Sequence, residues 1–154
     1  MTLALDVRIA GPGDLSTVLS IHAAHRADVQ SADRPSRAEE VTWDRMMGTA
    51  DLTVYLAHLG AAAVGTATVM VMPNVTYDCA PTVFIEAVVV VPEHRRKGVA
   101  TAILERILDD SRAAGCNKVQ LLSHKRHAVD GAHALYVAAS FTAEAEGFRC
   151  YLEE

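Results

Sequence analysis

The chain has 154 residues, enough for one compact domain, and 51% of them are hydrophobic, so it can bury a sizeable core. Fourteen basic against nineteen acidic residues give a formal net charge of −5, which argues against a general nucleic-acid binder. No basic region precedes the first apolar residues, and the uncharged stretch 59–77 carries glycines and a proline that favour strands over a membrane-spanning helix. Three cysteines at no metal-ligand spacing predict free thiols in a reducing cytoplasm.

Hydrophobic periodicity and turn residues predict a mixed α/β chain. Ser36 and Glu39 form a capping box at a helix start. The β-branched run 82–91 predicts a central strand buried on both faces. In chain order we expect a strand at 7–9, a helix from Asp14, a helix over 36–48, strands over 52–59, 63–72 and 82–91, a helix over 98–114, a strand over 118–122, a helix over 131–139 and a strand over 148–152.

The most informative segment is 88–104, where a valine-rich strand stops at Pro92 and Gly98 stands at the start of an amphipathic helix. The first N–H groups of a helix are unpaired and lie at the positive end of its dipole, so a helix start can hold an anion. The Arg-Arg-Lys run at 95–97 concentrates positive charge there. The residues alone leave two interpretations open, a phosphate site or a helix start with a solvated basic cluster.

The run Arg95-Arg96-Lys97-Gly98-Val99-Ala100 resembles the R/Q-x-x-G-x-G/A signature of the GNAT superfamily of acyl-CoA-dependent N-acetyltransferases. Nearer the C-terminus, Ala-His-Ala-Leu-Tyr at 132–136, followed by Ser140-Phe141, is similar to the superfamily's A-x-x-(L/F)-Y-x-x-x-G-F segment. The resemblance implies a central, mixed, mostly antiparallel sheet flanked by helices, with a splayed pair of central strands. It also implies a single N-acetyltransferase domain over 1–154.

The resemblance further implies where acetyl-CoA, the co-substrate, binds. The pyrophosphate is expected on the backbone of 96–101, and the pantetheine arm is expected to pair like an extra strand with 88–90. The acceptor amine then attacks the thioester in a ternary complex, so that proximity lowers the barrier without a covalent enzyme intermediate. No metal is expected. The implied cofactor-binding residues are Val88, Val89, Val90, Arg95, Arg96, Lys97, Gly98, Val99, Ala100 and Thr101.

Two residues are candidates for the proton transfers. Glu86 is the only charged residue between Thr82 and Val91, and burying a lone carboxylate in an apolar strand is costly, which favours it as the base over a strand-end glutamate reaching solvent. The resemblance places Tyr136 where the family has the acid that protonates the departing thiolate; the alternative is a tyrosine packed against the sheet.

The chain also departs from the family pattern around Tyr136. Val129 stands where the family often has a cofactor-contacting asparagine, and Ser140 replaces a glycine. Residues 125–127, Lys-Arg-His, form either a solvated loop or a site for an anionic substrate group. His124, Trp43, Met46 and Met47 are candidates to line the acceptor cleft, although core packing is the alternative for the tryptophan and the two methionines.

We therefore expect an enzyme that acetylates a primary amine of a small molecule with acetyl-CoA. The alternatives are a protein or peptide N-acetyltransferase and a non-catalytic CoA sensor module. The expected partners are acetyl-CoA and the amine, without nucleic acid or membrane, and the family resemblance leaves a homodimer open. Variable loops choose the acceptor in such a fold, so the sequence does not name it.

Overall fold

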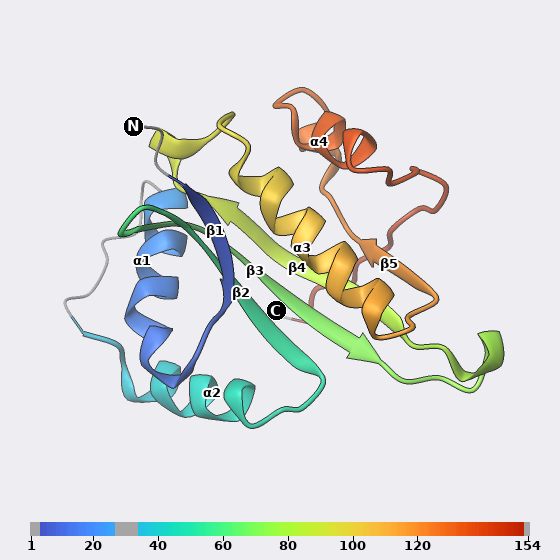
Figure 1. The fold of residues 1–154 in the computed structure, drawn as a ribbon, viewed down its shortest axis with the longest axis horizontal. Coiled ribbons are helices and arrows are strands. Elements are labelled where there is room, and N and C mark those ends of the chain that lie inside the picture. The colour runs from blue at the N-terminus through green and yellow to red at the C-terminus, as the bar shows by residue number, and fades with distance from the viewer. Residues whose placement is uncertain (1–3, 27–33, 153–154) are drawn as a thin grey trace. The chain divides into compact units, whose positions relative to one another are not determined.

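The structure is a computed structural model, and it describes residues 4–26 and 34–152 (Figure 1). The chain forms two compact units, residues 1–121 and 122–154, which are described separately below. Within the described ranges no helix is both long enough and apolar enough to cross a membrane.

The first unit is built on a five-stranded sheet in the order β1-β2-β3-β4-β5. Neighbouring strands are antiparallel except β4 and β5, which run parallel. The sheet is therefore mixed and mostly antiparallel, as the family resemblance implies. The strands are β1 (Leu5–Ile9), β2 (Leu52–Leu59), β3 (Ala62–Met72), β4 (Thr82–Val90) and β5 (Lys118–Leu121).

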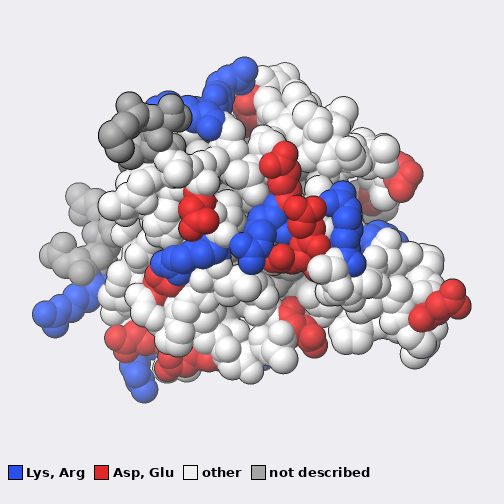
Figure 2. Space-filling model, viewed as in Figure 1, with Lys and Arg blue, Asp and Glu red and all other residues white. Residues whose placement is uncertain are grey.

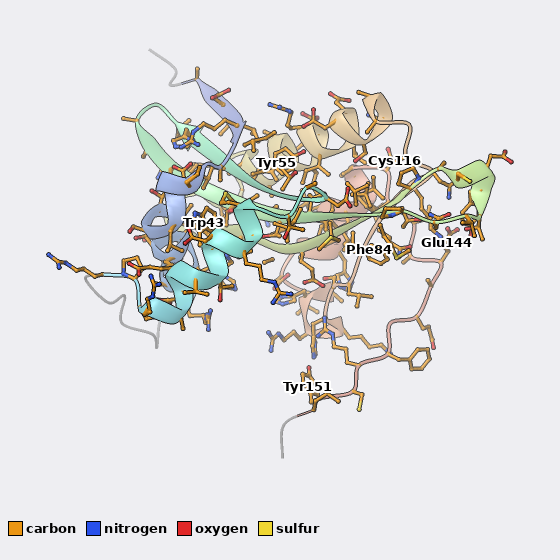
Figure 3. All side chains as sticks on the ribbon, turned by 90° about the horizontal axis from the view of Figure 1, so that it is seen from below. Trp43, Tyr55, Phe84, Cys116, Glu144 and Tyr151 are labelled. Atoms are coloured by element: carbon orange, nitrogen blue, oxygen red, sulfur yellow. The ribbon has the colours of Figure 1, made fainter. Side chains whose placement is uncertain are left out.

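Helices cover both faces of this sheet (Figure 3). On one face, α1 (Leu15–His25) and α2 (Arg37–Met47) enclose a core cluster. On the other face lies α3 (Val99–Ala113), whose Asp110 accepts a hydrogen bond from the Tyr55 hydroxyl at 2.9 Å. Short 3-10 helices occupy Pro12–Asp14, Tyr77–Cys79 and Pro92–His94. The core cluster consists of Ala10, Val18, Ile21, Trp43, Val54, Leu56 and Val89.

The exposed side of α3 carries charge of both signs. Figure 2 shows acidic and basic side chains gathered together across this helix. Two ion pairs within it join Arg106 to Asp110 at 2.9 Å and Arg112 to Asp109 at 2.8 Å. Arg106 also donates to the Val7 carbonyl at 2.8 Å, so the helix is tied to β1 as well as packed on the sheet.

Local sequence signals account for several element ends. The predicted capping box is present, because the Glu39 N–H donates to the Ser36 hydroxyl at 3.2 Å and the Ser36 N–H donates to the Glu39 carboxylate at 2.7 Å. The predicted helix over 98–114 is observed over 99–113, and it is followed by Gly115 with a φ of 69°.

The second unit contains the 3-10 helix η4 (Lys125–Ala128) and the helix α4 (Ala132–Ala138). The helix predicted at 131–139 is thus confirmed. The strand predicted at 148–152 is wrong, because these residues belong to no described ladder and Phe148, Tyr151 and Leu152 are all exposed. Alternating apolar residues form a strand only where a neighbouring edge pairs with them, and no described strand does so.

Candidate active site

The most distinctive feature of the first unit is the second edge of β4. The ladder between β4 and β5 ends at the pair Ile85–Leu121, while β4 continues to Val90. Among the described residues of this unit, the β5-side edge of β4 is therefore unpaired beyond Ile85. A bulge begins at the same point, because Ala87 has a φ of 52° and two β4 residues oppose the single residue Ala67 of β3.

The bulge changes which backbone groups face the unpaired edge. Beyond it, the Val91 N–H donates to the Val64 carbonyl at 3.0 Å, and strand alternation then turns the backbone polar groups of Val90 toward the unpaired side. The Val90 carbonyl accepts a hydrogen bond from Nε of Arg95 at 3.2 Å. An unpaired strand edge is a template for an extended chain, which makes this edge suited to a linear ligand with amide groups.

The edge leads directly to the start of α3. Gly98 is the N-cap residue, and no side chain caps the first turn, so its N–H groups stay available to an anion. Arg96 and Gly98 have φ angles of 58° and 81°, the left-handed conformation that curls successive N–H groups into an anion-binding hollow. A Cβ added at Gly98 would meet nothing within 4 Å, so there is open space above this backbone.

Positive charge surrounds this helix start. Arg95, Arg96 and Lys97 are exposed, and no described carboxylate lies within ion-pair distance of them. Arg95 also bonds Nδ1 of His25 at 2.9 Å and so links the end of α1 to the end of β4. His25 was not predicted from the sequence, because this contact spans seventy residues and no local pattern indicates it.

The other residues expected at the cofactor differ in exposure. Val89 and Val99 are 7% and 2% exposed, so they offer backbone groups and a supporting core rather than side-chain contacts. Val88 and Ala100 are half-buried, and Thr101 is exposed.

Glu86 is exposed, so the expectation of a buried lone carboxylate is wrong. It pairs with Thr68 of β3, which in turn pairs with Val54 of β2, a member of the core cluster under α1 and α2. Cross-strand partners share a face, so Glu86 lies on the face opposite α3. An apolar run with period two does not show that helices cover only part of a strand. The exposure of Glu86 could therefore not be predicted from the sequence.

In the second unit, Tyr136 is half-buried and its ring meets Phe141 edge-on, with centroids 6.0 Å apart. Burial, and secondarily the negative charge of Asp130, raise the pKa of Tyr136 above its usual value, so its hydroxyl keeps its proton at neutral pH. Asp130 accepts from the Ala132 N–H at 3.1 Å and from the His127 ring, so it holds the start of α4. Asp130 was not among the residues predicted from the sequence.

The remaining candidates serve the local structure. His124 caps η4 by accepting from the Arg126 N–H at 3.1 Å. Trp43 is 4% exposed and donates to the Pro12 carbonyl at 3.0 Å, and Met46 and Met47 pack against the core cluster. Core packing is thus the structural role of all three α2 residues. No metal-binding group of histidine, cysteine or acidic residues occurs within the described ranges.

Comparisons with known proteins find solved structures of the same fold. A solved structure from Agrobacterium tumefaciens, of a protein thought to be an acetyltransferase, has a TM-score of 0.85 at 27% identity, covering 95% of this chain and 99% of that one. A Trypanosoma brucei acetyltransferase has a TM-score of 0.78 at 26% identity, covering 97% of this chain and all of that one.

A third solved structure shares the fold at lower identity. It is the aminoglycoside N-acetyltransferase AAC(6')-Iy in complex with CoA, with a TM-score of 0.78 at 18% identity, covering 99% of this chain and 97% of that one. No curated protein matches the chain. The model of the acetyltransferase (GNAT) family matches residues 19–141, so the chain belongs to the GNAT acetyltransferase family.

Proposed function

We propose that the protein transfers the acetyl group of acetyl-CoA to a primary amine of a small molecule, with residues 1–154 acting as one domain in the cytoplasm. The observation that carries this proposal is the continuous path from the unpaired edge of β4 to the uncapped, positively charged start of α3. An extended amide-bearing arm that ends in a pyrophosphate matches both parts of this path.

The residues present fit acetyl-CoA as follows. The N–H groups of the first turn of α3 and the left-handed residues Arg96 and Gly98 receive the pyrophosphate. Arg96 and Lys97 add positive charge beside it. The backbone of Val88 and Val90 faces the pantetheine amides along the edge. The hydrogen bond from Arg95 Nε to the Val90 carbonyl breaks when this carbonyl accepts from a pantetheine amide.

Direct attack needs three proton movements. The amine nitrogen forms a bond to the thioester carbonyl carbon, the carbon–sulfur bond breaks, CoA leaves as the thiolate, and the acylated nitrogen releases its extra proton to solvent. An alkylammonium has a pKa near ~10 and must first lose a proton, which Glu86 accepts directly or through water. Tyr136, whose raised pKa keeps it protonated, donates to the thiolate.

A panel of amines tests the proposal. Release of free thiol from acetyl-CoA is measured with primary amines, with peptides bearing a free N-terminus or lysine, and without acceptor. We expect amine-dependent release with small amines. Release only with peptides would indicate the protein-acetylating alternative, and binding of acetyl-CoA without any amine-dependent release would contradict the enzyme and leave a sensor module.

A further inference from the structure

The face of the sheet opposite α3 carries an uncovered apolar strip. Cross-strand pairing places Met70 beside Phe84, and Met72 follows two residues further on the same face of β3. Thr68 and Glu86 form the next pair along these strands. The apolar strip consists of Met70, Met72 and Phe84, and Glu86 lies at one end of it.

The helices on this face stop short of the strip. Val54, in the row covered by α1 and α2, is 1% exposed, whereas Met70 and Met72 are 40% and 44% exposed. Phe84 is half-buried, and Figure 3 shows it on the opposite side of the sheet from Tyr55, which lies toward α3. Methionines exposed beside an aromatic ring form an apolar patch that adapts to ligands of different shape.

The charges on this surface have a defined arrangement. Among the strand residues of β3, β4 and β5 that share the face, only Glu86 and Lys118 are charged. Lys118 lies at the far end, opposite Thr82, and its Nζ sits 5.2 Å from the centre of the Tyr77 ring. A ligand on the strip therefore meets one carboxylate beside the unpaired edge of β4 and mostly apolar atoms beyond it.

We propose that the acceptor is a primary amine carried on an apolar body, an arylalkyl or alkyl amine, which lies along the strip with its ammonium at Glu86. This substrate class rests on the proposed function, because it takes Glu86 as the point of proton removal. Thr68 to Met72 spans roughly 13 Å at about 3.3 Å per residue, room for a ring and a short alkyl chain. A polyhydroxylated amine would instead leave hydroxyl groups unpaired against the methionines.

Steady-state kinetics with 2-phenylethylamine, hexylamine, ethylamine and glucosamine test this inference on the full chain. For the wild type we expect kcat/KM for 2-phenylethylamine to exceed that for glucosamine by about tenfold or more. Met70→Gln keeps the side-chain length but adds an amide. It should raise KM for 2-phenylethylamine about tenfold, while KM for acetyl-CoA and for the short ethylamine stays within about twofold.

Val41→Gln is the matched control, because Val41 is 51% exposed on α2, two residues from the buried Trp43 and on another side of that helix. Val41→Gln should leave KM and kcat/KM for all four amines unchanged. A preference for glucosamine, or an unchanged KM for 2-phenylethylamine in Met70→Gln, would overturn the apolar acceptor while leaving the acetyltransferase intact.

Failure of the proposed acetyl transfer can be told apart from failure of amine binding at the strip. If no amine is acetylated, calorimetric titration of 2-phenylethylamine still measures whether the strip binds an apolar amine. Binding to the wild type that is weakened in Met70→Gln supports a strip for apolar amines, and absence of binding to the wild type overturns it.

Discussion

At the scale of single residues, the site depends on one local departure from strand geometry. Ala87 takes a φ of 52°, a conformation that costs a residue other than glycine roughly 1–2 kcal/mol, and the bulge it creates brings the polar groups of Val90 to the unpaired edge. The sequence singled out Glu86 by its isolation, but not its exposure. The bulge falls at an alanine in a β-branched run, where no glycine marks it.

Glu86→Gln tests the base. The amide keeps the shape but cannot accept the proton, so turnover at neutral pH should fall by roughly 10²-fold, and by less at high pH, where the amine is already neutral. Glu105→Gln, a change at an exposed glutamate of α3, should leave the rate unaltered. An equal loss of turnover at every pH would indicate damage to binding or folding. An unchanged turnover would show that Glu86 is a solvent-exposed strand residue with no role as the base.

Tyr136→Phe tests the acid. The ring and its edge-on contact with Phe141 are kept and only the hydroxyl is lost, so the fold should survive. We expect the single-turnover rate to fall roughly tenfold, a modest effect because a thiol with a pKa near ~8.5 leaves readily, while acetyl-CoA affinity is unchanged. Tyr151→Phe, at a 78% exposed tyrosine, is the control. Weaker cofactor binding with an unchanged rate would assign Tyr136 a positioning role instead.

The Asp14 carboxylate makes a pH-dependent contribution to the free energy of unfolding. Two hydrogen bonds from Arg8, at 2.7 and 2.8 Å, and one from the Gly11 N–H lower the pKa of Asp14 from 3.8 to about 2. A lowered folded-state pKa stabilises the fold above the unfolded value, and this contribution is lost as pH falls from about 4 toward 2. Asp14→Asn should lower the free energy of unfolding at pH 7 by about 1–2 kcal/mol, allowing for partial exposure of Arg8.

Urea unfolding of wild type and Asp14→Asn at pH 7 and near pH 3 measures this term, and the difference should shrink at the lower pH. Asp109→Asn is the control, because its pair with Arg112 is largely exposed and contributes little. A difference for Asp14→Asn that stays constant with pH would contradict the assigned cause.

At the scale of elements, capping residues and strong hydrophobic periodicity allowed the positions of several helices and strands to be predicted. The predicted strand over 52–59 is observed with the same ends, and α2 begins at the predicted capping box. The predicted strand over 148–152 failed because an apolar alternation says nothing about an available partner edge. The end of the β4–β5 ladder at Ile85 likewise depends on the neighbouring strand, and only the family resemblance implied it.

The packing of α3 on β3 offers an element-scale prediction. A Cβ at Gly65 would lie 2.9 Å from Cγ1 of Val99 and 3.1 Å from Cδ1 of Ile103, so Gly65→Ala must displace these side chains at the start of α3. We expect a loss of about 1–3 kcal/mol in the free energy of unfolding and weaker acetyl-CoA binding, because Val99 directly follows Gly98. Gly13→Ala, where a Cβ meets nothing within 4 Å, should change neither. Wild-type stability and affinity in Gly65→Ala would show that α3 does not need this close approach.

At the scale of the whole molecule, the candidate residues are distributed over both compact units. The unpaired β4 edge, the start of α3 and Glu86 belong to the first unit, and Tyr136 belongs to the second. Family membership follows from the match over 19–141 and agrees with the motif at 95–100. The proposed acceptor surface, the apolar strip, depends on where the helices stop covering the sheet, and no sequence motif predicts that.

Calorimetric titration of acetyl-CoA into Gly98→Glu and Gly115→Glu tests whether the start of α3 binds the pyrophosphate. Both glycines have positive φ, 81° and 69°, and a Cβ at either meets nothing within 4 Å, so the two substitutions carry similar backbone strain at opposite ends of α3. We expect Gly98→Glu to abolish binding, because a carboxylate then occupies the pyrophosphate position, and Gly115→Glu to bind like the wild type. Undiminished binding by Gly98→Glu would contradict a pyrophosphate site at the start of α3.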